Sequence, residues 1–330
     1  MKYVPFGSTG LKVSRLCLGT MTFGLQCDES TSIAILNAAA DAGIDFLDTA
    51  DVYPIGGSLD TVGRTEEIIG RWLRGRRDQV VLATKCVGRM GAKPWQQGAS
   101  RRHIMEAIEA SLSRLQTDYV DLYQLHSDDS TTPLDEALEA LDRLVQAGKV
   151  RYVGCSNFLA YRLARALGRS DARGLARFVS VQPRYNLLFR QIERELLPLC
   201  QEEHLAVIPY NPLAGGLLTG KHRGAANPAA GTRFTLGTAG KMYTERYWHQ
   251  REFSAIESFS RLADEAGIDL ATLAVAWVLK HSAITAPIVG ASKPEQLNAS
   301  VAAVECVLPG DLKAELDELT HEFRMGDAPR

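Results

Sequence analysis

Four side chains that can hold or move a proton follow short apolar runs of the chain: Asp48, Tyr53, Lys85 and His126. A phenol, with a pKa of about 10, is a poor acid or base at neutral pH, and a neighbouring lysine cation lowers that pKa. A carboxylate would fix the ammonium, and an imidazole can donate a hydrogen bond to a substrate oxygen. This set predicts proton delivery to a carbonyl oxygen, with a hydride-carrying cofactor completing the reaction.

Each of these residues alone has an ordinary structural explanation. An Asp at a strand end usually caps a helix, a Lys there usually reaches solvent, and a single His is more often structural than catalytic. Asp48, Lys85 and His126 follow three consecutive apolar runs, so their side chains are expected to converge at one edge of a sheet. The joint placement favours the catalytic interpretation.

The elements that must position these residues alternate along the whole chain. Eight short apolar runs predict buried parallel strands, at 16–20, 46–49, 80–85, 120–126, 151–155, 178–183, 206–210 and 287–291. Amphipathic stretches between and after them predict helices, among them 30–42, 100–115, 133–147, 254–266 and 270–281. Eight strand–helix units predict a single (β/α)8 barrel domain over residues 1–330. An open doubly wound sheet is the alternative, but no GxGxxG follows the first strand.

Two segments fall outside the repeat. Residues 3–13 predict a short hairpin that turns at 7–10, and residues 213–250 predict a long polar loop after strand seven. We expect the substrate pocket to form from 87–98, 213–250 and 321–330. Four loop aromatics are candidates to line it, namely Trp95, Tyr243, Tyr247 and Trp248.

The remaining strand ends are suited to a nucleotide. Amide side chains can bind a carboxamide, an aromatic can stack on its ring, and Gly with Lys can receive a phosphate. The residues at these ends are Ser156, Asn157, Gln182, Tyr210, Asn211, Pro212, Gly290, Ser292 and Lys293. They predict a nicotinamide cofactor across the barrel mouth.

The sequence resembles the aldo-keto reductases over essentially its whole length. Seven ordered motifs carry the resemblance: FLDTADVY, VLATK, DYVDLYQLH, VGCSNF, VQPRYN, YNPLAGGLLTG and GASKPEQL. It is similar to the bacterial branch near the potassium-channel beta-subunit-like and aryl-alcohol-dehydrogenase-like reductases. The resemblance implies NADPH-dependent carbonyl reduction, with Asp48, Tyr53, Lys85 and His126 as the catalytic tetrad and Tyr53 as general acid.

The same resemblance implies a set of cofactor contacts. Ser156, Asn157 and Gln182 match residues that hold the nicotinamide amide, and Tyr210 matches the ring-stacking aromatic. The other matching positions are Gly19, Thr20, Asp48, Asn211, Pro212, Leu213, Gly215, Leu217, Lys221, Gly290, Ser292, Lys293 and Gln296. At the adenine end the chain departs from the family, which often has an acidic residue and Asn where Ala299 and Ser300 stand.

The residues after the eighth predicted strand bear on the choice between NADPH and NADH. Ser292 and Lys293 lie just past strand eight, at the start of a predicted helix over 294–304. A 2′-phosphate there would meet a hydroxyl, an ammonium and the positive end of a helix, so we expect NADPH to be preferred over NADH. The alternative is an ordinary lysine directed into solvent.

Composition excludes several other classes. The 330 residues carry 37 Lys and Arg against 39 Asp and Glu, so a basic nucleic-acid or anionic-membrane surface is not expected. The longest apolar stretch, 270–279, is about half of a bilayer span, and the first residues hold no apolar secretory segment. The six cysteines form no CxxC pair and predict reduced thiols in a cytoplasm. No metal-ligand spacing occurs, so no metal is expected.

Three functional alternatives can be weighed. The segment GGLLTGK fits a phosphate loop, but His222 follows where Ser or Thr is needed. A barrel glycosidase needs a second carboxylate across the mouth, and none stands out at a strand end. A cofactor-binding regulatory or redox-sensing subunit with slow turnover stays open, because such subunits resembling this branch keep the same tetrad.

Overall fold

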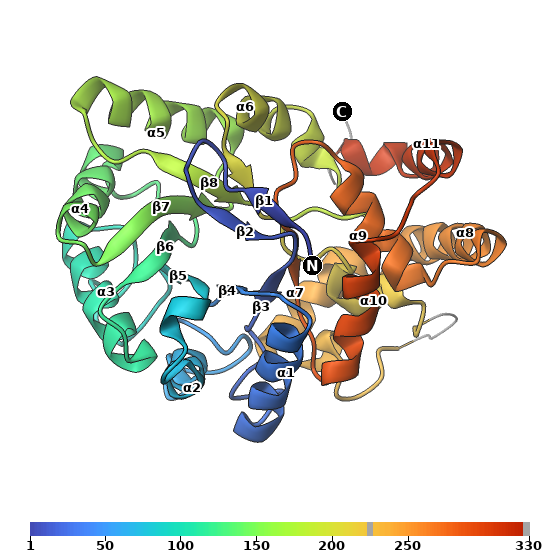
Figure 1. The fold of residues 1–330 in the computed structure, drawn as a ribbon, viewed down its shortest axis with the longest axis horizontal. Helices are drawn as coiled ribbons and strands as arrows, with labels where there is room; N and C mark the ends of the chain where they lie inside the picture. Colours follow the sequence, from blue (N-terminus) through green and yellow to red (C-terminus); the bar gives the residue numbers. More distant parts are fainter. Residues whose placement is uncertain (223–226, 326–330) are drawn as a thin grey trace.

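Eight parallel strands, most of whose residues are buried, form the centre of the molecule (Figure 1). The computed structural model describes residues 1–222 and 227–325. The barrel strands are β3 (Cys17–Gly19), β4 (Phe46–Asp48), β5 (Val81–Cys86), β6 (Val120–Leu125), β7 (Val150–Ser156), β8 (Phe178–Gln182), β9 (Ala206–Val207) and β10 (Ile288–Val289). They pair in the order β10-β3-β4-β5-β6-β7-β8-β9, which confirms the parallel alternation predicted from the sequence.

The barrel closes between its two shortest strands. Parallel bridges link Val207 to Ile284 and Tyr210 to Ile288, beyond the two-residue ladders of β9 and β10. The Ile288 amide donates to the carbonyl of Pro209 at 2.8 Å. These bonds complete the ring, so the predicted strand 206–210 is present as a short strand followed by Tyr210, which bridges to both Arg184 and Ile288.

Helices surround the barrel and bury its outer face (Figure 1). They are α1 (Glu29–Asp41), α2 (Arg64–Leu73), α3 (Arg101–Leu115), α4 (Leu134–Gln146), α5 (Ala160–Arg173), α6 (Leu196–Glu202), α7 (Gly237–Tyr247), α8 (Gln250–Ala266), α9 (Leu270–Lys280), α10 (Leu297–Ala303) and α11 (Gly310–Leu319). Several begin at side-chain caps that satisfy a free amide: Asp28 accepts from Thr31, and Asp269 accepts from Thr272. The predicted helices agree within a few residues.

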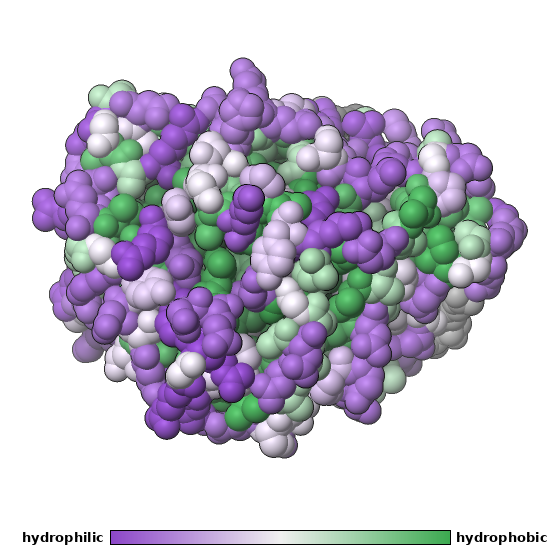
Figure 2. Space-filling view, viewed as in Figure 1, coloured by the Kyte–Doolittle hydropathy of each residue, from purple (hydrophilic) through white to green (hydrophobic). Residues whose placement is uncertain are grey.

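A hairpin covers the amino-terminal end of the barrel. Strands β1 (Tyr3–Pro5) and β2 (Lys12–Ser14) are antiparallel, as predicted, and cross this end in Figure 1. Phe6 stands edge-on to Phe46, with ring centroids 5.7 Å apart, inside a cluster of inward-facing strand residues. Gly7 must be glycine, because its φ is +59° and a Cβ would lie 2.8 Å from the Ala206 nitrogen. Figure 2 shows this face, where hydrophilic residues surround and interleave the hydrophobic ones.

The expectation of a plain loop over 213–250 is wrong. Its described residues contain short 3-10 turns at Ala214–Thr219 and Arg233–Thr235 and the helix α7. Tyr243 and Tyr247 therefore lie on a helix rather than in a loop, with both side chains buried. Their burial supplies the tertiary contacts that hold a segment whose polar composition gave no helical signal.

Candidate active site

The four predicted catalytic residues lie at the carboxyl-terminal end of the barrel. Asp48 is the last residue of β4, Lys85 lies near the end of β5, and His126 follows β6 directly. Tyr53 lies five residues beyond β4. Parallel pairing of β4, β5 and β6 brings these strand ends side by side, so the convergence expected from the sequence is present.

Lys85 uses all three of its ammonium hydrogens within this group. Its Nζ donates to Asp48 Oδ1 at 2.5 Å, to the Thr49 carbonyl at 2.8 Å and to Tyr53 Oη at 3.3 Å. The lysine side chain is fully buried. Because the phenol oxygen accepts from Lys85, its own hydrogen is free to be donated to another acceptor.

The second oxygen of Asp48 is also occupied. Gln124 Nε2 donates to Asp48 Oδ2 at 3.0 Å and Gln182 Nε2 donates at 2.9 Å. The two amides also bond to one another at 3.1 Å. Gln124 was not identified from the sequence, although a buried polar residue inside the apolar run of β6 is the signal that could have found it. Satisfied on both oxygens, the Asp48 carboxylate is a fixed anchor for Lys85.

Burial and charge set the protonation states of the group. Burial alone would lower the pKa of Lys85, but Asp48 and Tyr53 outweigh it and raise that pKa, so the ammonium stays charged. Burial lowers the pKa of His126 to about 3, assisted by the Lys85 charge, so the imidazole is neutral at pH 7. Its ring stands edge-on to that of Tyr53, with centroids 5.7 Å apart.

One electrostatic expectation needs correction. Lys85 was expected to bring the pKa of Tyr53 down, but burial raises that pKa, and the opposing effect of Lys85 is smaller. The phenol is therefore protonated at neutral pH. Lys85 limits the rise rather than reversing it, because the same barrel that brings the cation close also removes the phenol from water.

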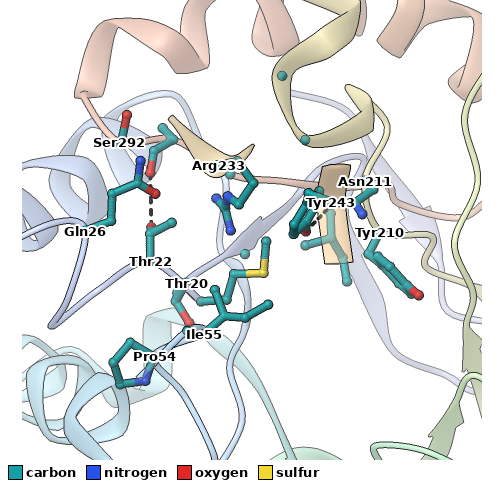
Figure 3. A pocket seen from close by; sticks show the side chains of 18 of the residues that line it. Thr20, Thr22, Gln26, Pro54, Ile55, Tyr210, Asn211, Arg233, Tyr243 and Ser292 are labelled. Atoms are coloured by element: carbon teal, nitrogen blue, oxygen red, sulfur yellow. Dashed lines mark hydrogen bonds between the residues drawn. The ribbon is translucent and has the colours of Figure 1, made fainter. Parts of the chain in front are cut away.

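A cavity of about 950 Å³ opens at this end of the barrel. Figure 3 shows part of a pocket wall, with side chains such as Thr20, Tyr210 and Arg233. Asp48, Tyr53 and His126 form part of the cavity wall, while Lys85 lies beneath it. The predicted cofactor residues that also line it are Gly19, Thr20, Ser156, Asn157, Gln182, Tyr210, Asn211, Pro212, Leu213, Gly215, Lys221, Gly290, Ser292 and Gln296. Two others do not: Leu217 is buried in the hydrophobic core, and Lys293 is exposed outside the cavity wall.

Hydrogen bonds order the polar residues next to His126. Asn157 Nδ2 donates to the His126 carbonyl at 2.9 Å and to Ser156 Oγ at 3.0 Å. The Tyr210 hydroxyl donates to Asn157 Oδ1 at 2.8 Å. Asn157 adopts a φ of +58°, which an Asn tolerates better than most residues. The polar groups of Ser156 and Asn157 are thus fixed beside the Tyr210 ring, an arrangement that suits a planar carboxamide.

A second part of the wall is cationic. Arg233 Nη1 is buried with no hydrogen-bond partner among the described residues. Burial lowers the pKa of Lys221, and the Arg233 charge lowers it further, so the two cations lie near one another. The backbone at Gly215 packs directly against Tyr243, because a Cβ on Gly215 would lie 2.6 Å from the Tyr243 ring. An orphaned guanidinium beside a glycine turn fits the diphosphate of a dinucleotide.

The segments expected to form the substrate pocket contribute unequally. Arg89 lines the cavity from 87–98, and many residues do so from 213–250, including Tyr243. None of residues 321–325 lines it, and 326–330 lie outside the described residues. Of the other predicted aromatics, Tyr247 is buried, Trp248 packs on Phe234 at 4.9 Å, and Trp95 is exposed beneath the guanidinium of Arg102.

Across residues 1–222 and 227–325, no helix has the length and apolarity to cross a bilayer. The same residues bring together no three His, Cys, Asp or Glu side chains that could hold a metal ion. Ala299 lines the cavity and Ser300 is buried, at the positions where the chain departs from the expected pattern.

Fold and site together define a class: a (β/α)8 barrel with a buried Lys85–Tyr53 pair beside a large cavity at the carboxyl-terminal end of its strands. The family model of the Aldo/keto reductase family matches residues 15–321, and the chain belongs to that family.

Relatives of similar length match along nearly the whole chain. The oxidoreductase YrpG of Bacillus subtilis is 41% identical over 97% of this chain and 96% of its own. A probable voltage-gated potassium channel subunit beta of Arabidopsis thaliana is 35% identical over 93% of this chain and 92% of its own. A putative aryl-alcohol dehydrogenase of Schizosaccharomyces pombe is 34% identical over the same shares, 93% and 92%. The predicted resemblance is confirmed, and the protein is an oxidoreductase that acts on carbonyls.

Proposed function

We propose that the protein reduces an aldehyde or ketone to an alcohol with NADPH, and that Tyr53 is the general acid. The observation that carries this proposal is the use of all three Lys85 donors by Asp48, the Thr49 carbonyl and Tyr53 Oη. This arrangement leaves the phenolic hydrogen available to a substrate oxygen. A bound nicotinamide would supply the hydride.

His126 has the protonation state that substrate orientation requires. Its neutral imidazole carries one N–H, which can donate to the carbonyl oxygen and stabilise the negative charge that develops there. A pKa of about 3 keeps His126 from competing with Tyr53 as a proton source. The phenol donates its proton while Lys85 stabilises the phenolate that is left.

The cofactor contacts follow from the cavity wall. We place the nicotinamide amide against Ser156, Asn157 and Gln182, with its ring on Tyr210. The diphosphate lies at Gly215 and Lys221, where Arg233 adds a cation that the sequence did not reveal. The remaining proposed contacts are Gly19, Thr20, Asn211, Pro212, Leu213, Leu217, Gly290, Ser292, Lys293 and Gln296. Of these, Leu217 acts only by supporting the turn from within the core.

NADPH is the proposed nucleotide because Ser292 and Lys293 start the turn Pro294–Gln296. Gln296 Oε1 accepts from both the Ser292 amide and its hydroxyl, which holds this turn in place. Because Lys293 is exposed, a 2′-phosphate would meet it at the edge of the groove. Wild type should bind NADPH about ten- to a hundredfold tighter than NADH, and Lys293→Ala should reduce that ratio. Equal affinities in wild type, or an unchanged ratio in the variant, would remove Lys293 from the site.

Continuous turnover separates an enzyme from a regulatory subunit. The similarity to a potassium channel subunit beta makes a nucleotide-binding sensor the alternative. When an enzyme is mixed with NADPH and a panel of small aldehydes and ketones, NADPH should be oxidised steadily over many turnovers. Arrest after about one turnover would favour the sensor. The six free cysteines support a reducing compartment, and we propose the cytoplasm.

A further inference from the structure

The charges on the cavity wall are unevenly distributed. Asp48 is neutralised by Lys85, and the other two acidic residues, Asp269 and Glu295, lie on the wall formed by α9 and the turn before α10. Arg89 and Arg246 also line the cavity, and neither has a carboxylate partner among residues 1–222 and 227–325. Two guanidinium groups without counter-charges therefore face the same space.

Helix α7 aims Arg246 into that space. Met242, Tyr243 and Arg246 all line the cavity, and their spacing of one, three and four residues places them on one face of the helix. Lys241 and Glu245 occupy the opposite, exposed face, where they pair at 3.8 Å. Tyr243 fixes the rotation of α7, because its buried hydroxyl donates to Asn211 Oδ1 at 3.0 Å.

Arg246 lines the same cavity as Tyr210, Asn157 and His126. Burial raises the pKa of Tyr210, and the Arg246 charge opposes that rise, so the guanidinium is within electrostatic reach of the Tyr210 hydroxyl. That hydroxyl bonds to Asn157, which in turn bonds to the His126 carbonyl. Tyr53, the proposed proton donor, lines the same cavity as Arg246.

Arg89 reaches the cavity from the loop after β5. The backbone there is constrained, because Val87 has a φ of +96° and a Cβ on Gly88 would lie 2.7 Å from Val52. A β-branched residue rarely adopts such a φ, so the loop is held by its packing against the Tyr53 loop. Arg89 is exposed and lines the cavity, and its Nε donates to the Gly91 carbonyl at 3.1 Å.

We propose that the substrate is an aldehyde or ketone that also carries a carboxylate, bound by Arg246, with Arg89 as a second cation on the same cavity wall. The proposal rests on the carbonyl reduction proposed above and leaves its chemistry unchanged: hydride goes to the carbonyl carbon and the Tyr53 proton to its oxygen. One half-buried and one exposed guanidinium suit a monoanion, and a planar fork matches a carboxylate with two hydrogen bonds.

A pair of substrates that differ in charge and by one methyl group tests this. Succinic semialdehyde and its methyl ester should be compared by kcat/KM with NADPH. In wild type, kcat/KM for the acid should exceed kcat/KM for the ester by about tenfold or more, which is the effect of one charge-assisted hydrogen bond. Arg246→Gln should remove most of this tenfold preference for the acid, and Arg89→Gln should remove less of it. Arg246→Lys should retain part of the preference. Added salt should raise KM for the acid more than for the ester.

Lys241→Gln is the matched control, because it removes one positive charge from the exposed face of the same helix. It should leave the ratio unchanged. A wild-type ratio near one, or a ratio that Arg246→Gln does not alter, would overturn the proposal while carbonyl reduction stands. If neither compound nor any other small aldehyde is reduced, the proposed function fails and this inference falls with it.

Discussion

The two sides of the cavity differ in how they satisfy their charges. On the strand side, Lys85 bonds to Asp48, Thr49 and Tyr53, and Asp48 bonds to two amides as well. On the side built by residues 213–250, Arg233 and Arg246 have no carboxylate partner among the described residues. One side is complete within the protein, whereas the other holds cations that an anionic ligand would neutralise.

This difference separates two tasks. Proton transfer needs groups that are held in fixed positions. The hydrogen bonds and the ion pair that fix them are therefore made between residues of the barrel, although burying these charged groups is unfavourable. Ligand binding needs groups that gain more from the ligand than from the protein, so their partners are left out. Substitutions on the strand side should therefore affect rate and stability, and substitutions on the other side should affect affinity.

Lys85→Met should have the largest combined effect. It leaves the Asp48 carboxylate buried without its cation, which costs about 3–5 kcal/mol of folding free energy. It also removes the charge that stabilises the phenolate, so kcat should fall about a hundredfold or more. Urea unfolding and steady-state kinetics measure the two effects.

The double variant Asp48→Asn with Lys85→Met separates them. The double variant removes both buried charges, so it should recover much of the folding free energy that Lys85→Met loses. It should recover none of the lost kcat. Wild-type turnover in Lys85→Met, or equal instability in the double variant, would contradict a coupled Asp48–Lys85–Tyr53 group.

Arg233→Ala should act on affinity. Loss of its guanidinium, whose Nη1 is buried without a partner among the described residues, should weaken NADPH binding by about ten- to a hundredfold and leave the unfolding free energy nearly unchanged. Nucleotide fluorescence titration measures this, with Lys241→Ala as an exposed control of equal charge change. An unchanged dissociation constant would show that the cation serves the fold and not the ligand.

The strand side was also the more predictable from the sequence. Asp48, Lys85 and His126 terminate apolar runs, and parallel pairing alone brings such ends together. Gln124 was missed because a polar residue within a strand has no fixed role until its neighbours are known. The phenol pKa was misjudged because burial depends on the assembled barrel, not on the residues near Tyr53.

The side built by 213–250 was less predictable for a physical reason. Helix α7 is held by tertiary contacts of Tyr243 and Tyr247, and no amphipathic repeat announces it. Arg233 and Arg246 stand in polar sequence, where a charged residue is usually solvated. Only the fold shows that both line the cavity.

His126 should give the smallest effect, seen in the pH dependence of stability. Its pKa of about 3 in the fold lies below the value of about 6.5 expected when unfolded. Between these values the unfolded chain binds a proton that the native state does not, so stability falls as pH drops from about 6.5 toward 3.

His126→Phe should remove that contribution, up to about 1.4 kcal/mol for each pH unit in this window. Denaturant unfolding at pH 7 and pH 5 compares the two proteins, and both should lose the stability due to other groups equally. Parallel pH dependences for wild type and variant would show that the imidazole is not held neutral.

The most direct test of the central claim is a single turnover of Tyr53→Phe with NADPH already bound. The ring is kept, so packing and nucleotide affinity should stay near wild type, while the hydroxyl is lost, and with it both the proton donor and the oxygen that accepts from Lys85. We predict that the decay of NADPH absorbance on mixing with an aldehyde slows by about 10²–10⁴-fold, the usual contribution of a general acid. A rate within a few-fold of wild type, with NADPH bound normally, would contradict the assignment of Tyr53 as the proton donor.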